Sequence, residues 1–156
     1  MKKFLIAALV ASTLVAVPVA QGATMSSMSS KVTLSVKATG MDVTMASNMK
    51  MGGAKTGSAN GKFVLDTKKN TLCYSVTTVG LTGVAEAHIH SGAMGVDGAD
   101  VVAFVPAKFN AKTATCVKVA TKLLGDIAMN PSMYYFNVHT AKFPDGAVRG
   151  QLVKGM

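Results

Sequence analysis

Short stretches in which every second residue is apolar, separated by turn-forming residues, run through most of this 156-residue chain. In residues 31–38, for example, Val32, Leu34 and Val36 take alternate positions. Successive side chains of a β-strand point to opposite faces, so such a stretch buries one face and leaves the other polar. Comparable stretches occupy 62–66, 71–79, 87–90, 100–105, 116–120, 133–140 and 147–153.

The segments between these stretches carry turn signals. Residues 67–70 and 80–83 indicate tight connections, and Phe-Pro-Asp-Gly at 143–146 predicts the turn between the last two strands. Residues 40–61 are rich in Gly, Ser, Asn and Lys, which predicts a long loop with room for one helical turn.

One segment has helical spacing instead. In residues 121–129 the apolar positions are Leu123, Leu124, Ile127 and Ala128, and Asn130-Pro131 ends the pattern. Many short strands with one small helix predict an all-β fold: an antiparallel Greek-key β-sandwich or barrel, for example an immunoglobulin-like one.

The N-terminus has the features of a secretory signal peptide. Lys2 and Lys3 precede an uncharged apolar run over 4–20, and small residues follow as a cleavage site. Pro18 interrupts the run, which disfavours a retained membrane anchor. We therefore predict a signal peptide at 1–23, a flexible Met/Ser leader at 24–30 and a single domain at 31–154, exported to the periplasm or the medium, with no membrane span after cleavage.

Cys73 and Cys116 are the two cysteines of the chain. An even number of cysteines in an exported protein predicts one disulfide, because export delivers thiols to an oxidising compartment. Thiolate metal ligation is the weaker alternative, since the two residues form no C-x-x-C pattern.

The chain is basic, with a formal net charge of +9, or +7 once Lys2 and Lys3 are removed. The lysines are scattered and Arg149 is the sole arginine, whereas nucleic-acid-binding domains gather basic residues on one face. No nucleic-acid partner is predicted. Glu86 is the sole glutamate, which leaves no defensible carboxylate pair for hydrolysis.

All three histidines lie in two of the predicted strands. His88 and His90 share one face of their strand, and Ala87 and Ile89 take the other. In the second strand, His139 is placed by the same parity on the face opposite its apolar neighbours.

If these strands adjoin, the three imidazoles converge on a single metal ion, for which neutral imidazole suits zinc, copper, iron or nickel. The alternative is a solvated His-x-His pair that binds nothing, since three histidines alone make an incomplete structural zinc site. Asp97, in the following glycine-rich loop, is a candidate additional ligand or a turn-forming residue.

Methionines form a second candidate metal-binding feature. Met41, Met45 and Met49 recur every four residues and Met51 follows them. Thioethers select Cu(I), which makes this loop a candidate soft-metal site. The alternative is that methionine serves here as a flexible apolar filler or contact residue.

Two segments resemble a known family. AHIHSGAMGVDGADVV at 87–102 and NPSMYYFNVHTAKFPDGAVRGQL at 130–152, with cysteines in L-C-Y and C-V, closely resemble the CHRD domain of chordin and of many exported microbial proteins. The resemblance covers about residues 31–153, although the 40–60 loop lacks the E-V-P-P-like stretch often found there. It implies an exported all-β domain and places all three histidines inside family motifs.

A looser similarity is to copper/zinc superoxide dismutase, which also has an H-x-H strand and a late histidine followed by a glycine-rich segment and an arginine. This similarity implies a dismutase-like variant of the predicted β-sandwich or barrel. On that similarity His88, His90 and His139 would be copper ligands and Arg149 would guide an anion to the metal. No fourth histidine is present to bridge copper and zinc.

These observations favour an exported metal-binding protein, with copper preferred over zinc. The alternatives are a non-catalytic extracellular interaction or structural module that binds no metal and has an unidentified partner, and a dismutase-like oxidoreductase. A non-catalytic role is favoured over an enzymatic one.

Overall fold

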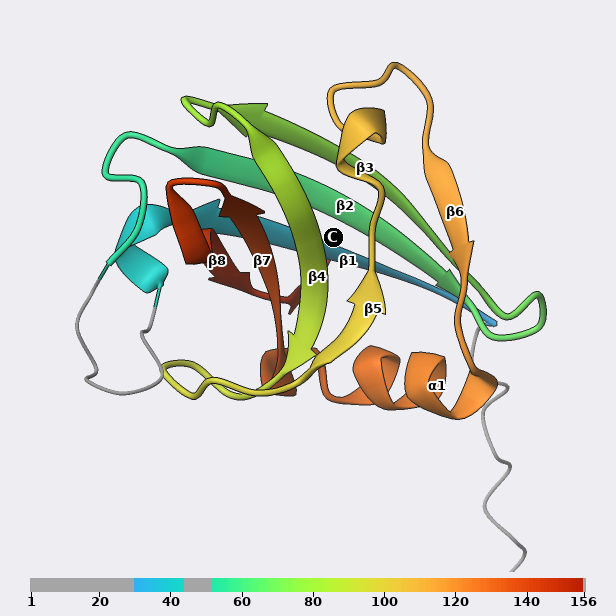
Figure 1. The fold of residues 1–156 in the computed structure, drawn as a ribbon. Helices are drawn as coiled ribbons and strands as arrows, with labels where there is room; N and C mark the ends of the chain where they lie inside the picture. Colours follow the sequence, from blue (N-terminus) through green and yellow to red (C-terminus); the bar gives the residue numbers. More distant parts are fainter. Residues whose placement is uncertain (1–29, 44–51, 156) are drawn as a thin grey trace, which may run out of the picture.

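The computed structural model describes residues 30–43 and 52–155 (Figure 1). The predicted signal peptide, the leader up to residue 29 and the positions of Met45, Met49 and Met51 lie outside the described residues. The strands are β1 (Lys31–Thr39), β2 (Ser58–Asp66), β3 (Thr71–Val79), β4 (Val84–Ser91), β5 (Asp100–Ala103), β6 (Thr115–Lys118), β7 (Tyr134–Thr140), β8 (Phe143–Gln151) and β9 (Val153–Lys154). The helices are α1 (Thr121–Met129) and the 3-10 turns η1 (Gly40–Asp42), η2 (Pro106–Lys108) and η3 (Pro131–Met133).

The strands form one antiparallel sheet. Its order is β5-β4-β7-β8-β1-β2-β3-β6, and β9 pairs with β1. The sheet curls into a half-barrel, and α1 lies across one end of it (Figure 1). The prediction of an all-β antiparallel fold with one short helix is confirmed. Within the described residues, no helix is long and apolar enough to span a membrane.

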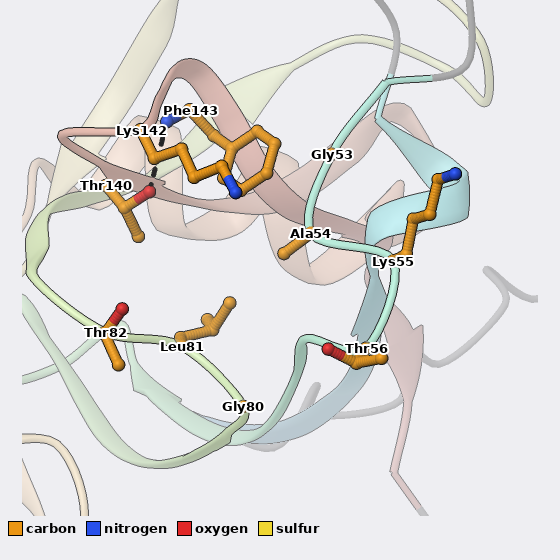
Figure 2. Close-up of a pocket in the computed structure, with 10 residues that line it drawn as sticks. All are labelled: Gly53, Ala54, Lys55, Thr56, Gly80, Leu81, Thr82, Thr140, Lys142 and Phe143. Atoms are coloured by element: carbon orange, nitrogen blue, oxygen red, sulfur yellow. Dashed lines mark hydrogen bonds between the residues drawn. The ribbon is translucent and has the colours of Figure 1, made fainter.

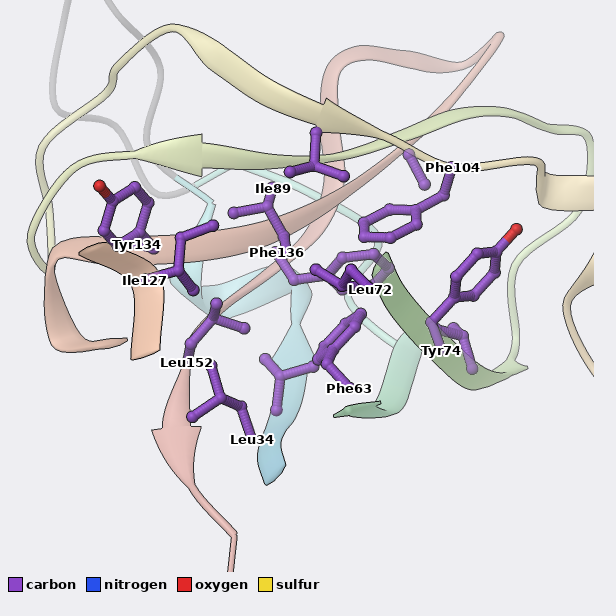
Figure 3. Close-up of a cluster of buried hydrophobic side chains, with 14 of the residues drawn as sticks. Leu34, Phe63, Leu72, Tyr74, Ile89, Phe104, Ile127, Tyr134, Phe136 and Leu152 are labelled. Carbon is purple, nitrogen blue, oxygen red and sulfur yellow. The ribbon is translucent and has the colours of Figure 1, made fainter. Parts of the chain in front are cut away.

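The apolar side of the curled sheet holds the core. Phe63 lies with its ring centroid 5.5 Å from that of Phe136 and 5.6 Å from that of Phe104, and all three rings are buried. From α1, Leu124 and Ile127 enter the same core fully buried (Figure 3 shows Ile127 in this cluster). The spacing that predicted this helix therefore marks the face that closes the end of the half-barrel.

The two cysteines lie at the far edge of the sheet from β5. Cys73 on β3 is directly opposite Cys116 on β6, and they form a disulfide. The predicted pairing is confirmed. β6 is a four-residue edge strand whose one neighbour in the sheet order is β3, and the disulfide ties these two strands together covalently.

One predicted loop is shorter than expected. The turn-like composition of residues 40–61 predicts a loop, but β2 begins at Ser58. Ala59 is fully buried, and a Cβ on Gly61 would lie 2.9 Å from Val36 Cγ1. Small residues occur here because the start of β2 packs closely against the side chains of β1, such as Val36. The single helical turn expected in the loop corresponds to η1.

The turn predicted at residues 143–146 is wrong. The chain reverses at Ala141 and Lys142, and Phe143 already pairs with Thr140 as the first residue of β8. Gly146 has a φ of 135° and lies so close to Asn137 that a Cβ would be 2.7 Å from Asn137 Oδ1. Glycine is therefore required by the extended chain and not by a turn.

Candidate metal centre

The pairing of β4 with β7 brings the three histidines together. His88 lies opposite Asn137, and His139 lies opposite Glu86, one diagonal step from His88. On the other face of the same strands, Ile89 and Phe136 are fully buried in the core. The strand parity inferred from the sequence is therefore confirmed: the histidines occupy the face away from the core.

The three imidazoles form a compact cluster. Ring centroids are 5.5 Å apart for His88 and His90, 5.3 Å for His88 and His139, and 5.9 Å for His90 and His139. One nitrogen from each ring lies within 4.8 Å of the others, and all three residues are half-buried. Nitrogens bound to one zinc ion at about 2.0–2.1 Å lie at most about 4.2 Å apart, so small side-chain rotations would complete a shared site.

Backbone carbonyls select the tautomer of two of these histidines. The Nδ1 of His90 is 3.0 Å from the carbonyl oxygen of Gly98, and the Nδ1 of His139 is 2.7 Å from that of Pro144. A carbonyl oxygen only accepts hydrogen bonds, so each Nδ1 carries the proton and each Nε2 keeps its lone pair. This is the arrangement by which histidine ligands are oriented in metal sites.

The same two Nε2 atoms are buried without a partner. In the part of the chain that the structure describes, the buried side-chain nitrogen and oxygen atoms that lack a hydrogen bond are His90 Nε2, His139 Nε2 and Asn137 Oδ1. Asn137 is 5% exposed and shares the histidine face. Each of these three atoms is an acceptor, and buried acceptors are normally satisfied.

The protonation state of His90 favours metal binding. Burial lowers the pKa of His90 below its ordinary value of 6.5, and the charges of His88 and His139 lower it further. The hydrogen bond to Gly98 and the charge of Asp100 act in the opposite direction. His90 is therefore neutral at neutral pH, which is the form that coordinates metals.

Arg149, the candidate anion guide, is a buried side chain. It is 3% exposed, and its Nη1 donates a 2.6 Å hydrogen bond to Asp97 Oδ1. Asp97 accordingly contacts Arg149 and is not a member of the histidine cluster. The two residues form an ion pair beside the cluster. The anion-guiding role of Arg149 stays a prediction.

Of the predicted soft-metal loop, Met41 is described, and Met45, Met49 and Met51 lie outside the described residues. Met41 belongs to η1 and is 69% exposed. The methionine site stays a prediction.

Tyr135 is a residue of this site that sequence reasoning missed. It lies opposite His90 in the β4–β7 register, and the two rings stack with centroids 4.8 Å apart and planes 3° from parallel. The available signal was parity, since Tyr135 is four residues before His139 and therefore on the same strand face.

A separate cavity of about 490 Å³ lies beside the turn that follows β7 (Figure 2). It is lined by residues of 53–56, 80–82 and 140–143, including Lys55 and Lys142. The Lys142 ammonium lies 5.5 Å from the ring centroid of Phe143. Its lining contains lysines and none of the histidine, cysteine or carboxylate side chains that form the candidate metal centre.

Comparison with family models identifies the domain. Residues 34–152 match the model of the CHRD domain. The chain belongs to the CHRD family. Neither the curated proteins nor the solved structures give a match.

The CHRD match covers the whole curled sheet except its first residues and β9. All three histidines, both cysteines and Arg149 fall inside it. The resemblance noted from the sequence is therefore confirmed, and the histidine cluster is a feature of the CHRD domain of this chain. A CHRD domain with a disulfide is consistent with an extracellular or periplasmic module.

Proposed function

We propose that this CHRD-domain protein is an exported metal-binding protein that holds a copper ion, with zinc as the second choice, through His88, His90 and His139. The observation that carries the proposal is the pair of buried, unpartnered Nε2 atoms of His90 and His139. Their Nδ1 atoms are already engaged, so a metal ion is the partner that satisfies both Nε2 lone pairs at once.

The preference for copper follows from the ligand type. Imidazole sites bind divalent first-row metals in an order that peaks at Cu²⁺, ahead of Zn²⁺. Three nitrogens leave at least one coordination position for water or a small ligand. The half-buried rings keep the site within reach of solvent, so that metal can enter.

The disulfide and the predicted N-terminal signal peptide support an exported location. The Cys73–Cys116 bond joins two strands of the folded domain, and such bonds persist in oxidising compartments. We therefore place the protein in the periplasm or the medium, after removal of the predicted signal peptide.

Titration of the apo-protein with Cu²⁺ and with Zn²⁺ tests the proposal. We expect one equivalent of Cu²⁺ to bind, tighter than Zn²⁺, and each of His88→Ala, His90→Ala and His139→Ala to weaken binding at least about 10-fold, because each removes one of three ligands. Far-UV circular dichroism controls for folding. Equal affinity in the parent and all three variants would contradict the proposed ligand set.

The two alternatives give different outcomes in the same experiment. A non-catalytic interaction module binds neither ion stoichiometrically and is indifferent to chelators. A dismutase-like oxidoreductase binds copper and also turns over superoxide, a property that metal binding alone does not require.

A further inference from the structure

Arg149 contacts both the ring that stacks on His90 and the loop that follows His90. β7 has β4 on one side and β8 on the other, so Tyr135 lies between His90 and Arg149. The guanidinium carbon of Arg149 is 3.4 Å from the ring centroid of Tyr135, and His90 stacks on Tyr135 at 4.8 Å. Guanidinium, phenol and imidazole thus form a continuous stack across three strands.

The same guanidinium holds the loop that follows His90. Besides the bond to Asp97, Arg149 Nη2 donates to the carbonyl oxygens of Ala93 at 3.0 Å and Val96 at 2.7 Å. These three acceptors lie within five consecutive residues, and the fixed fork of an arginine side chain matches them in a way that a lysine ammonium does not.

The loop held by Arg149, residues 92–98, ends at Gly98, which orients His90. The Gly98 carbonyl accepts the hydrogen bond from His90 Nδ1 at 3.0 Å. Tyr135 also contacts Gly98, because its hydroxyl lies 3.2 Å from Gly98 N and 3.4 Å from Gly98 O. We call this set of contacts from Arg149, Asp97 and Tyr135 the Arg149 clamp. Arg149 therefore reaches His90 by two routes, one through the Tyr135 ring and one through the loop and Gly98.

From these contacts we propose that Arg149, with Asp97 and Tyr135, is the positioning residue that fixes His90 in the Nδ1-protonated tautomer and aims its Nε2 at the metal. The expected effect on metal affinity rests on the proposed function. The structural part of the inference, the tautomer of His90, is defined without any metal.

His139 supplies an internal control for this role. Its Nδ1 bonds to Pro144 in β8, on a path that does not include Asp97 or the 92–98 loop. Loss of the Arg149 clamp should therefore release His90 and leave His139 unchanged. A merely structural role of Arg149 would disturb both histidines together.

The experiment compares Arg149→Lys and Asp97→Asn with the exported parent protein. Asp97→Asn keeps the shape of the side chain and removes the ion pair at its more exposed member, Asp97. If Arg149→Lys does not fold, Asp97→Asn alone tests the inference. Asp145→Asn is the matched control, because it removes an exposed carboxylate next to the His139 partner Pro144 and does not touch the 92–98 loop.

Long-range ¹⁵N–¹H correlation spectra of the metal-free proteins report the tautomer of each histidine at a pH where all are neutral. We expect one Nδ1-protonated form for His90 and His139 in the parent and in Asp145→Asn. In Arg149→Lys and Asp97→Asn we expect mixed tautomers for His90 alone. Parent-like His90 spectra in both variants would overturn the inference, as would equal changes in His139.

Titration with Cu²⁺ gives the second readout. The affinity should fall about 10- to 100-fold in the two clamp variants, the range found when outer-sphere partners of histidine ligands are removed, and stay unchanged in Asp145→Asn. A parent that binds no Cu²⁺ would refute the proposed function, while the His90 tautomer would still test the clamp. A parent that binds, with unchanged affinity in both folded clamp variants, would refute the clamp alone.

Discussion

At the scale of single residues, the sequence predicts which side of its strand each side chain occupies but not what orients it. Strand parity alone places His88 and His90 on the polar face of one strand and His139 on the polar face of another, and the pairing of the two strands brings them together. The carbonyls of Gly98 and Pro144 that select the tautomers are not predictable, because no side chain marks where a loop carbonyl points. Nor does the sequence predict the burial of an arginine, because that burial depends on a partner far away along the chain.

Gly98 should tolerate no side chain. A Cβ there would lie 1.7 Å from the carbonyl oxygen of Ser91, so Gly98→Ala must shift the backbone that holds His90. We expect a loss of at least about 2 kcal/mol in the free energy of unfolding, measured by urea denaturation.

Gly125→Ala is the matched control for that substitution. Gly125 lies inside α1, and a Cβ added there would meet nothing within 4 Å, so alanine should raise the free energy of unfolding by about 0.5–1 kcal/mol. Equal effects of the two substitutions would contradict the close packing at Gly98.

At the scale of elements, apolar periodicity predicts strands and the helix well, whereas turn composition is less reliable. Residues 121–129 form the expected helix because Leu124 and Ile127 lie on one face. Residues 58–61 and 143–146 are strands despite their Gly, Asn, Pro and Asp content, because close packing against Val36 and Asn137 selects small residues there. Composition does not distinguish a glycine that turns the chain from one that lets neighbours approach.

The attachment of α1 to β7 should be sensitive to alkaline pH. The Tyr134 hydroxyl donates a 3.1 Å hydrogen bond to Asp126 Oδ2, and burial followed by this bond raises the pKa of Tyr134 above 10.0. Tyrosine in the unfolded chain, with a pKa of about 10, loses its proton first as pH rises. The contribution of Tyr134 to stability is therefore complete below about pH 9 and is lost as pH rises through its raised pKa.

Tyr134→Phe isolates this contribution. Near neutral pH the variant should be less stable by about 0.5–1.5 kcal/mol, the net value of one hydrogen bond. The difference should shrink above about pH 10 in urea denaturation curves, since only the parent loses the bond there. If the difference in the free energy of unfolding between parent and variant stays constant over this pH range, loss of the Tyr134 proton does not weaken the bond to Asp126, and the prediction fails.

At the scale of the whole molecule, the all-β class is predictable and the strand order is not. Class follows from local alternation, but the adjacency of β4 and β7 joins segments separated by β5, β6 and α1. No local pattern encodes such a pairing, and the metal centre depends on it. The disulfide is predictable because two cysteines allow one pairing.

The disulfide should stabilise the fold without shaping the metal centre. In the sheet order β8, β1 and β2 separate the histidine strands from the Cys73–Cys116 pair. Cys73→Ser/Cys116→Ser should lower the free energy of unfolding by about 2–4 kcal/mol in denaturant titrations. Metal affinity measured below the unfolding transition should match that of the parent, and a lower affinity in the folded variant would show that the two regions are coupled.

Elemental analysis of the protein purified from an exported, disulfide-competent fraction tests the central claim most directly, beside the His88→Ala/His90→Ala/His139→Ala triple variant. We predict close to one copper per parent chain, or zinc where copper is scarce, and none in a triple variant that circular dichroism shows to be folded. Absence of metal from the parent after reconstitution with both ions, or equal metal in the folded triple variant, would contradict a three-histidine metal centre.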